Sequence, residues 1–195
     1  MAIATLEEFI AYGRDSMSGS NTIEAQLALD AAEEAVCDFC ARQFTLATGT
    51  PSVRRFRVAN PSTNMLAIDD CVSVTTVSDN GATISASGYQ LEPLNGRNAS
   101  GDVVPYDSIR RLDASWSWSF DGEALVSITA DWGWAEIPSR VKQAVLITAK
   151  DVYQQRNTTA GVVGVSDFGP IRARLNPVAL QLLKRLRRSE SFGVA

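Results

Sequence analysis

Thr129–Arg156, TADWGWAEIPSRVKQAVLITAKDVYQQR, contains the end of a predicted strand, an aromatic turn and one long predicted helix. Pro138 suits the first turn of a helix, because that position needs no N–H donor and has the φ that proline already adopts. Apolar residues then recur at steps of three and four, which places them on one stripe of the helix. These residues are Val141, Ala144, Val145, Ala149, Val152 and Tyr153. The stretch predicts a helix of about nineteen residues, roughly 28 Å long, on which the rest of the chain can pack.

One large apolar residue of this predicted helix lies outside the stripe. At about 100° per residue, Ile147 falls on the polar face together with Gln143, Lys150 and Gln154. An apolar side chain on a polar face is a candidate for contact between subunits, because burying it contributes about 1.5–3 kcal/mol. We therefore predict a subunit interface that contains these four residues.

The composition is that of a globular protein and argues against several classes of function. The chain has 195 residues, 45% of them hydrophobic, a net charge of −4 and no histidine. Without histidine, the usual catalytic triads and most histidine-based metal sites are excluded. The acidic charge argues against general DNA binding. There is no apolar run of membrane-spanning length, so we expect no membrane partner, and the N-terminal residues lack the pattern of a secretory signal. Three cysteines are too few for a disulfide framework, which fits a reducing cytoplasm.

Charge is distributed unevenly along the chain. Residues 1–40 contain eight acidic residues and one arginine, whereas residues 170–195 contain six basic residues and one glutamate. Ends of opposite sign suit head-to-tail contact between copies of the chain. Two solvated helix faces explain the same pattern equally well.

Two helices are predicted near the start of the chain. Thr5 and Glu8 form a capping box, T-x-x-E, that opens a short helix. Asn21 or Thr22 caps a second helix that runs to about Arg42. The predicted core stripe of the second helix is Ile23, Leu27, Ala28, Ala31, Ala32, Ala35, Phe39 and Cys40.

Short runs rich in valine, isoleucine, threonine and aromatic residues follow, and they predict antiparallel β structure. Asn80-Gly81, between two of these runs, is a strong signal for a two-residue hairpin. The predicted strands are Val53–Val58, Leu66–Ile68, Val72–Ser78, Ala82–Ile84, Tyr89–Leu91, Ile109–Leu112 and Leu125–Trp132. Because the β segment lies between helices that form one predicted bundle, we interpret it as an insertion and not as a separate domain.

The predicted fold class is therefore α+β: a small bundle of about four helices, with an antiparallel β region inserted between the second helix and the long helix. Asn176-Pro177 predicts the cap and first residue of the last helix. The predicted parts are the N-terminal helices of the bundle (1–48), the β-rich insertion (49–134), the long central helix (135–156), and the C-terminal arm and helix (157–195).

Cys37-x-x-Cys40 is the first candidate for chemistry. A redox pair is activated by a helix N-terminus, but this pair lies in the second half of a predicted helix. A structural zinc site needs four ligands, and with Cys71 the chain has three cysteines. We interpret these residues as buried free thiols and predict no metal site.

Adjacent carboxylates are the second candidate. Neighbouring side chains on a helix point in different directions, so Glu33-Glu34 is interpreted as a solvated face. Asp69-Asp70 follows a predicted strand and is interpreted as turn chemistry. The chain has no hydrolase or nucleotide-binding motif, so we predict no enzymatic activity and no cofactor. Catalysis by carboxylates alone is the enzyme class that the sequence leaves open.

Four tryptophans lie close together in the sequence, at positions 116, 118, 132 and 134. Exposed tryptophans can form a platform for a sugar or a nucleobase. They can also pack one face of the β region on the long helix, which is the interpretation that we favour. The platform gives the alternative function: a monomeric, β-rich binding module, with carbohydrate as the candidate ligand.

The order of four motifs resembles the head–tail connector (adaptor) proteins of long-tailed bacteriophages. Each motif alone is weak, but together they span nearly the whole chain. They are the opening helix Leu6–Tyr12 (LEEFIAY), the second helix Ala31–Phe44 (AAEEAVCDFCARQF), the strand–Gly-Trp–Pro junction Ile128–Pro138 (ITADWGWAEIP), and Asp167–Gly169 (DFG) followed by Leu182–Arg188 (LLKRLRR). The Asp69–Cys71 segment departs from the family, which often has a proline near that point.

The resemblance implies a structural role in the virion neck, the head–tail junction of a particle made in the bacterial cytoplasm. Such adaptors form a homo-oligomeric ring, usually a dodecamer, beneath the portal protein after DNA packaging. They join the portal to the stopper or tail-terminator protein and leave a channel through which the genome passes during ejection.

The resemblance also implies that the C-terminal segment engages the portal. We expect residues 157–195 to form an arm that orders on assembly, because the apolar face of its last helix is too large to leave in water without a partner. The candidate portal-docking residues are Phe168, Ile171, Arg172, Arg174, Leu182, Leu183, Lys184, Arg185, Leu186, Arg187 and Arg188.

Overall fold

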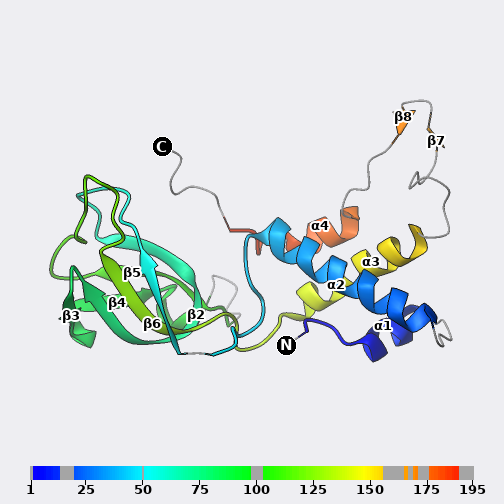
Figure 1. The fold of residues 1–195 in the computed structure, drawn as a ribbon, viewed down its shortest axis with the longest axis horizontal. Coiled ribbons are helices and arrows are strands. Elements are labelled where there is room, and N and C mark those ends of the chain that lie inside the picture. Colours follow the sequence, from blue (N-terminus) through cyan, green and yellow to red (C-terminus); the bar gives the residue numbers. More distant parts are fainter. Residues whose placement is uncertain are drawn as a thin grey trace. The chain divides into compact units, whose positions relative to one another are not determined.

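A computed structural model describes residues 2–13, 20–49, 51–97, 103–155, 165–166, 169–170 and 176–188. The described residues divide into two compact units. The helical unit comprises Met1–Arg42 and Ile137–Arg188, and the β unit comprises Gln43–Glu136. The α+β class is confirmed, with the sheet between the second and third helices in chain order (Figure 1). The four-part division of the chain stays a prediction.

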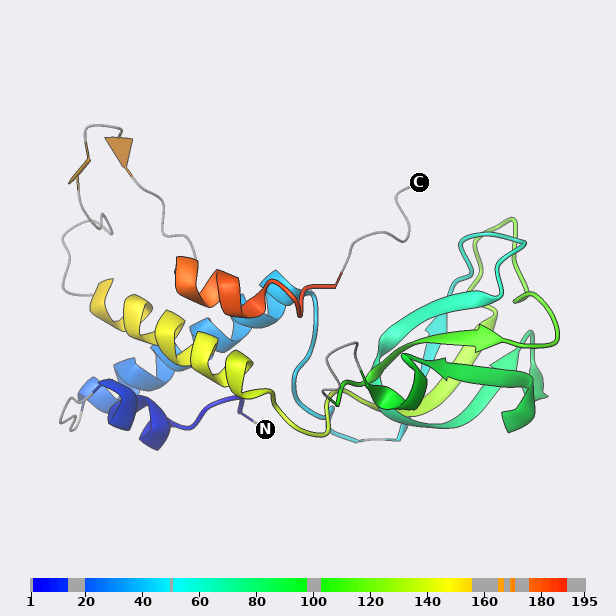
Figure 2. The same cartoon turned by 180° about the vertical axis from the view of Figure 1, so that it is seen from behind.

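The helical unit is built on the long helix, as predicted. Its helices are α1 (Leu6–Gly13), α2 (Ser20–Cys40), α3 (Ser139–Gln155) and α4 (Pro177–Leu183). Helix α3 packs against α2 and α4, and α1 contacts both α2 and α3 (Figure 2). Two short strands, β7 (Val165–Ser166) and β8 (Gly169–Pro170), pair between α3 and α4 in chain order.

Local signals set three of the helix starts. The capping box is present: Thr5 N–H donates to Glu8 Oε2 (2.9 Å) and Glu8 N–H donates to Thr5 Oγ1 (3.2 Å). Asn176 Oδ1 accepts from the backbone N–H of Val178 (2.9 Å), with Pro177 as the first helical residue. Pro138 lies directly before α3, and its carbonyl accepts the N–H groups of Val141 (2.8 Å) and Lys142 (3.2 Å). Helix α2 instead begins at Ser20, before the two residues predicted to cap it, and ends at Cys40.

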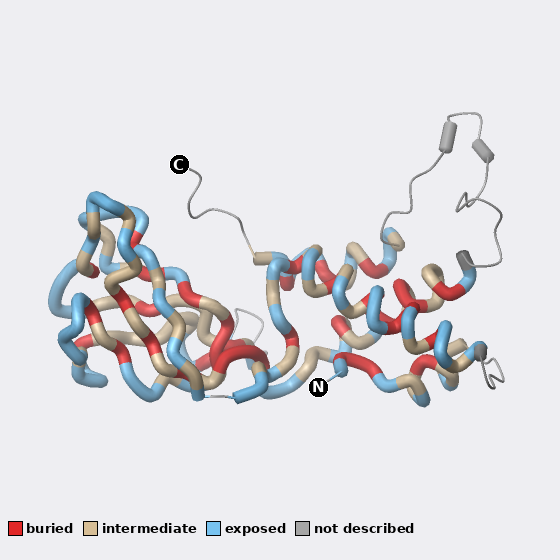
Figure 3. The backbone as a smooth tube through the Cα atoms, viewed as in Figure 1, coloured by how far each residue is buried: buried red, intermediate tan, exposed pale blue. Residues whose placement is uncertain are grey.

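The predicted core stripe of α2 is wrong over much of its length. The buried residues follow another row, and Ala28, Ala32 and Cys40 are the three that both rows share. The buried row is Ala25, Ala28, Leu29, Ala32, Val36 and Cys40. Ile23 and Leu27, expected in the core, are exposed, as is Ala31. Buried and exposed positions follow opposite sides of the helix (Figure 3).

Helix α4 does not leave its apolar face without a partner. Ala179 and Leu183 are fully buried and Leu186 is nearly so, within a unit in which α4 packs on α3. A side-chain hydrogen bond from Asn176 Nδ2 to Asp151 Oδ2 (2.9 Å) also links its start to α3. The expectation of an unpartnered apolar face is therefore wrong for Leu183 and Leu186, which the chain's own bundle buries, whereas Val178 is exposed and Leu182 half-buried.

The β unit contains one antiparallel sheet of six strands. Its order is β1-β6-β2-β5-β4, and β3 pairs with β2 beside this path. The strands are β1 (Ser52–Phe56), β2 (Met65–Asp79), β3 (Ala82–Ile84), β4 (Tyr89–Glu92), β5 (Tyr106–Arg111) and β6 (Val126–Trp132). Two short 3₁₀ turns, Ala86–Gly88 and Leu94–Gly96, flank β4. The Asn80-Gly81 hairpin is confirmed: both residues have positive φ, as a primed two-residue turn requires.

Strand β2 corrects the prediction of two strands separated by a turn. Asp69, Asp70 and Cys71 lie inside one strand of 15 residues. The pairing of β2 with β5 shifts register between Ala67 and Cys71. Such an irregularity places two polar residues within a strand without ending it.

Candidate functional site

Two buried polar arrangements hold the β unit together, and one of them contains the Gly-Trp motif. We call the group formed by Phe44, Asp70, Gly133 and Trp134 the Gly-Trp junction. Trp134 Nε1 donates to the buried Asp70 Oδ2 (2.7 Å), and Gly133 N–H donates to the Asp70 carbonyl (2.6 Å). The Phe44 ring packs on Trp134 with a centroid distance of 5.2 Å. The segment after β6 is thereby tied to β2, and Phe44, near the start of the β unit, packs on that segment.

Gly133 is required at this junction for two reasons. Its φ of +109° lies where side-chain-bearing residues are strained. A Cβ at this position would also overlap the carbonyl oxygen of Thr45. The segment that begins at Phe44 therefore passes against the backbone of the Gly-Trp turn. Next to it, Ala47 N–H donates to the Trp132 carbonyl (2.9 Å).

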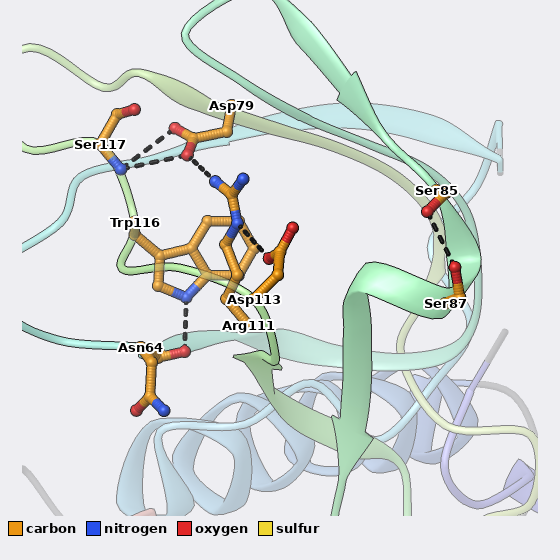
Figure 4. Close-up of polar contacts among 8 residues, drawn as sticks. All are labelled: Asn64, Asp79, Ser85, Ser87, Arg111, Asp113, Trp116 and Ser117. Atoms are coloured by element: carbon orange, nitrogen blue, oxygen red, sulfur yellow. Dashed lines mark hydrogen bonds and ion pairs between the residues drawn. The ribbon is translucent and has the colours of Figure 1, made fainter.

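The second arrangement, which we call the Asp79 clamp, consists of Asp79, Arg111, Trp116 and Ser117 (Figure 4). Arg111 Nη1 pairs with Asp79 Oδ2, and the Ser117 N–H donates to Asp79 Oδ2 (3.1 Å) and Oδ1 (3.3 Å). The guanidinium of Arg111 lies over the Trp116 ring, 5.7 Å from its centroid. The clamp fixes residues after β5 to the end of β2.

Two further contacts complete the clamp. Trp116 Nε1 donates to the Asn64 carbonyl (2.8 Å), and Arg111 Nε donates to Asp113 Oδ1 (3.1 Å). The Arg111 guanidinium lowers the pKa of the Asp113 carboxyl. Sequence reasoning missed Asp79 because an aspartate directly before Asn-Gly reads as a turn residue, and no sequence pattern indicates its burial.

Three of the four tryptophans are buried within the β unit. Trp116, Trp132 and Trp134 are almost completely inaccessible, and each indole N–H donates to an oxygen of the same unit. Trp132 packs with Phe56 at a centroid distance of 5.7 Å. Packing is therefore confirmed: Trp116 and Trp132 belong to the core of the sheet, and Trp134 packs on Phe44. These three side chains cannot form a ligand platform.

The remaining tryptophan lies at the surface. Trp118 is exposed and meets the more exposed Phe120 edge to face, with a centroid distance of 6.1 Å. The Asp79 clamp holds the segment that precedes this pair, since Ser117 is part of it.

The carboxylate interpretations are corrected by the structure. Glu33 is not only part of a solvated face, because its Oε1 accepts the backbone N–H groups of Ile3 (2.7 Å) and Ala4 (3.0 Å). Asp69 pairs with Arg54 (2.6 Å), and Asp70 belongs to the Gly-Trp junction. These carboxylates hold local structure and are not assembled into a catalytic pair.

Burial raises the pKa of two cysteine thiols. That of Cys40 rises to about 11 through burial and the neighbouring Cys37, and that of Cys71 to about 12 through burial and the charge of Asp70. Cys37 is half-buried. Within the described ranges, no group of three or more side chains could hold a metal ion.

These thiols give the protein an expected alkaline pH dependence. An unfolded thiol loses its proton near pH 9 while the folded protein retains it, so stability should fall from about pH 9 to about pH 11 for Cys40 and to about pH 12 for Cys71. In Cys40→Ala or Cys71→Ala the free energy of unfolding should fall less over this range than in the wild type. Urea titrations at several pH values measure this dependence of the free energy of unfolding on pH. If the variants lose free energy of unfolding with pH as steeply as the wild type, the thiols are not protected by burial.

A separate measurement tests the metal-free interpretation of the cysteines. Stoichiometric zinc in the purified protein would contradict it.

The predicted subunit-interface residues lie on the outer part of α3. Gln143 and Gln154 are exposed, whereas Ile147 and Lys150 are half-buried. Lys150 lies over the Tyr12 ring of α1, with its Nζ 5.8 Å from the centroid. Ile147 therefore has less apolar surface to offer a partner than a fully exposed side chain would.

The structure describes some of the predicted portal-docking residues and not others. Phe168, Ile171, Arg172 and Arg174 lie outside the described residues. The others belong to α4 and the turn after it: Leu183 and Leu186 are buried, Leu182 and Arg188 are half-buried, and Lys184, Arg185 and Arg187 are exposed. Arg187 lies over the Phe39 ring of α2 (5.7 Å to the centroid).

The chain shares its fold with proteins of gene transfer agent (GTA) particles. It is similar to a chain in the neck of an empty GTA particle with C6 symmetry, with a TM-score of 0.56 and 20% identity over 98% of this chain and 93% of that one. A chain in the neck of the native particle with C12 symmetry gives 0.50 and 19%, over 95% and 91%. A chain in the native GTA virion gives 0.55 and 18%, over 98% and 93%. No family model and no curated protein matches the chain.

Proposed function

We propose that this protein is a head-to-tail adaptor: a structural virion protein that forms a ring beneath the portal, joins it to the stopper or tail, and leaves a channel for DNA. The observation that carries the proposal is a fold match over nearly the whole chain to proteins of particle necks with C6 and C12 symmetry. The order of sequence motifs supports it independently. In the described part of the chain, no helix is long and apolar enough to cross a membrane.

The chemistry of the described residues agrees with a structural role. The carboxylates discussed above hold backbone or pair with arginine, and the buried thiols of Cys40 and Cys71 have raised pKa values. Burial of three tryptophans removes the platform on which the carbohydrate-binding alternative rested. We therefore propose no enzymatic activity.

The proposed partners are other copies of the chain, the portal protein and the stopper or tail-terminator protein. We assign portal contact to the segment between α3 and α4, which contains Phe168, Ile171, Arg172 and Arg174. Leu183 and Leu186 take no part in it, because both are buried in the helical unit.

The function is tested by mixing the purified protein with the portal protein of the same particle. Native mass spectrometry and cryo-electron microscopy should show a ring of twelve copies on the portal, or on its own at high concentration. A particle that lacks this protein should package DNA but carry no tail. A protein that never oligomerises and never binds portal would overturn the proposal.

The Ile147 face of α3 provides a further prediction. We propose that Ile147 contacts a neighbouring subunit, so Ile147→Asp should weaken ring formation while the monomer stays folded. Because Ile147 is half-buried, circular dichroism and the thermal midpoint of the variant must be measured alongside assembly. Assembly at wild-type affinity would contradict the interface role, and an unfolded monomer would show that Ile147 belongs to the core.

A further inference from the structure

The outer face of α2 carries a row of apolar side chains. Ile23 is 68% exposed and Leu27 63%, and Ala31 is exposed as well. Steps of four residues place all three on one line, opposite the buried row of the same helix. A surface helix ordinarily turns its apolar stripe toward its own core. Helix α2 has a buried row and also this exposed apolar row, which suits contact with a partner.

The same row borders a groove. Leu27 lines it together with Glu24 and Ala28 of α2 and with Val152 and Tyr153 of α3, around a volume of about 220 Å³. The lining is mostly apolar in residue type, and all of it belongs to the helical unit. The row therefore presents both a protruding line of side chains and a recess beside it.

Acidic residues surround the row. Exposed carboxylates lie at Glu24, Asp30, Glu34 and Asp38, and α2 contains no basic residue. A partner for this face should be apolar where Ile23 and Leu27 lie and basic toward the end of the helix, because unlike charges around an apolar centre favour a specific contact.

The chain itself offers such a surface on α4. Val178 is exposed and Leu182 half-buried, on the side that borders the buried row of Ala179, Leu183 and Leu186. Lys184 and Arg185 follow and are exposed. Arg185 lies on the same side as Val178 and Leu182, so this face of α4 ends in a basic residue, and the α2 face ends in the acidic Glu34 and Asp38. If α2 and α4 lie parallel and side by side, apolar side chains meet apolar side chains, and carboxylates meet the basic end of α4.

We propose that the outer face of α2 in one copy binds the outer face of α4 in the next copy around the ring. Pairing of two α2 faces is disfavoured, because carboxylate would meet carboxylate. A contact between two different faces of one chain is head-to-tail, and it generates a ring when the rotation between neighbouring copies closes. This inference rests on the proposed function, since it names the surfaces by which that ring is built.

The test uses two variants of the full chain, each with one broken face. Ile23→Asp with Leu27→Asp breaks the α2 face, and Arg185→Glu with Lys184→Glu breaks the α4 face. Each should need at least tenfold more protein for half-assembly of rings, with an unchanged thermal midpoint because these side chains are on the surface. Val53→Asp, at 63% exposed on β1, is the matched control and should assemble normally.

Mixing the two broken variants sharpens the result. Each keeps one intact face, so the mixture should form a one-to-one dimer and no ring. Charge exchange, Glu34→Arg combined with Arg185→Glu in one chain, should restore assembly relative to Arg185→Glu alone. Native mass spectrometry measures the oligomers formed by the mixture and by the charge-exchanged variant.

The outcomes separate the two proposals. If the wild type forms rings and the broken variants form them equally well, the α2–α4 contact is wrong while the adaptor function stands. Rings formed by the mixture of broken variants would also overturn the contact. A wild type that stays monomeric, alone and with portal, would overturn both.

Discussion

Gly133→Ala is expected to lower the free energy of unfolding of the β unit by about 3–5 kcal/mol. Two costs combine: alanine is strained at a φ of +109°, and its Cβ would overlap the Thr45 carbonyl oxygen, which belongs to backbone and cannot rotate away. Urea denaturation followed by tryptophan fluorescence measures the change, because three of the tryptophans are buried in this unit.

Gly81→Ala is the matched control for Gly133→Ala. Its φ of +81° carries strain, but no heavy atom lies within 4 Å of a Cβ there. We expect a loss of about 1–2 kcal/mol. Equal losses in the two variants would show that the close approach of Thr45 to Gly133 contributes nothing.

The position of the Gly-Trp junction determines where Gly133→Ala should reduce stability. Gly133 and Trp134 lie between the last strand of the sheet and α3 in chain order, and both are tied to Asp70 on β2. A Gly133→Ala protein that still folds at low temperature should therefore lose thermal stability first in the β unit. Hydrogen exchange by mass spectrometry would locate the loss.

Asp79→Ala is expected to cost about 2–4 kcal/mol, because removing one partner of a buried ion pair leaves the other poorly compensated. The Asp79 side chain is 4% exposed and accepts bonds from Arg111 and from the Ser117 N–H. Its loss leaves that N–H without its acceptor and releases the segment that carries Trp116. Equilibrium unfolding and near-UV circular dichroism measure the effect.

Asp113→Ala is the control for Asp79→Ala, because it removes the exposed partner of the same arginine. The Asp113 side chain is 61% exposed, and exposed ion pairs contribute about 0–1 kcal/mol. Asp79→Ala and Asp113→Ala should therefore differ severalfold. Similar losses would mean that the Asp79 clamp does not depend on burial.

Signals that act within a few residues were predictable from the sequence. The capping box of Thr5 and Glu8, the Asn80-Gly81 turn and the Asn176-Pro177 start are all present. Each depends on backbone geometry that neighbouring residues set by themselves. The same locality explains why the α+β class and the order of elements could be inferred.

The inner face of α2 could not be chosen from the sequence. Ile23-Leu27-Ala31 and Ala25-Leu29-Ala32-Val36 both have helical spacing. The predicted stripe contained the first row, yet the second row is buried. Small residues suit a close helix–helix contact, and only the packing of α2 on α3 determines which side is inward.

The roles of buried polar residues also came from tertiary structure alone. Asp70 and Asp79 look like turn residues in the sequence, but each accepts bonds from groups far along the chain, Trp134 and Ser117 respectively. Local sequence determined where three of the helices and the Asn80-Gly81 turn begin, because those choices depend on adjacent residues. Tertiary structure decided which faces are buried and which carboxylates are paired, because burial and long-range hydrogen bonds depend on residues that the fold brings together.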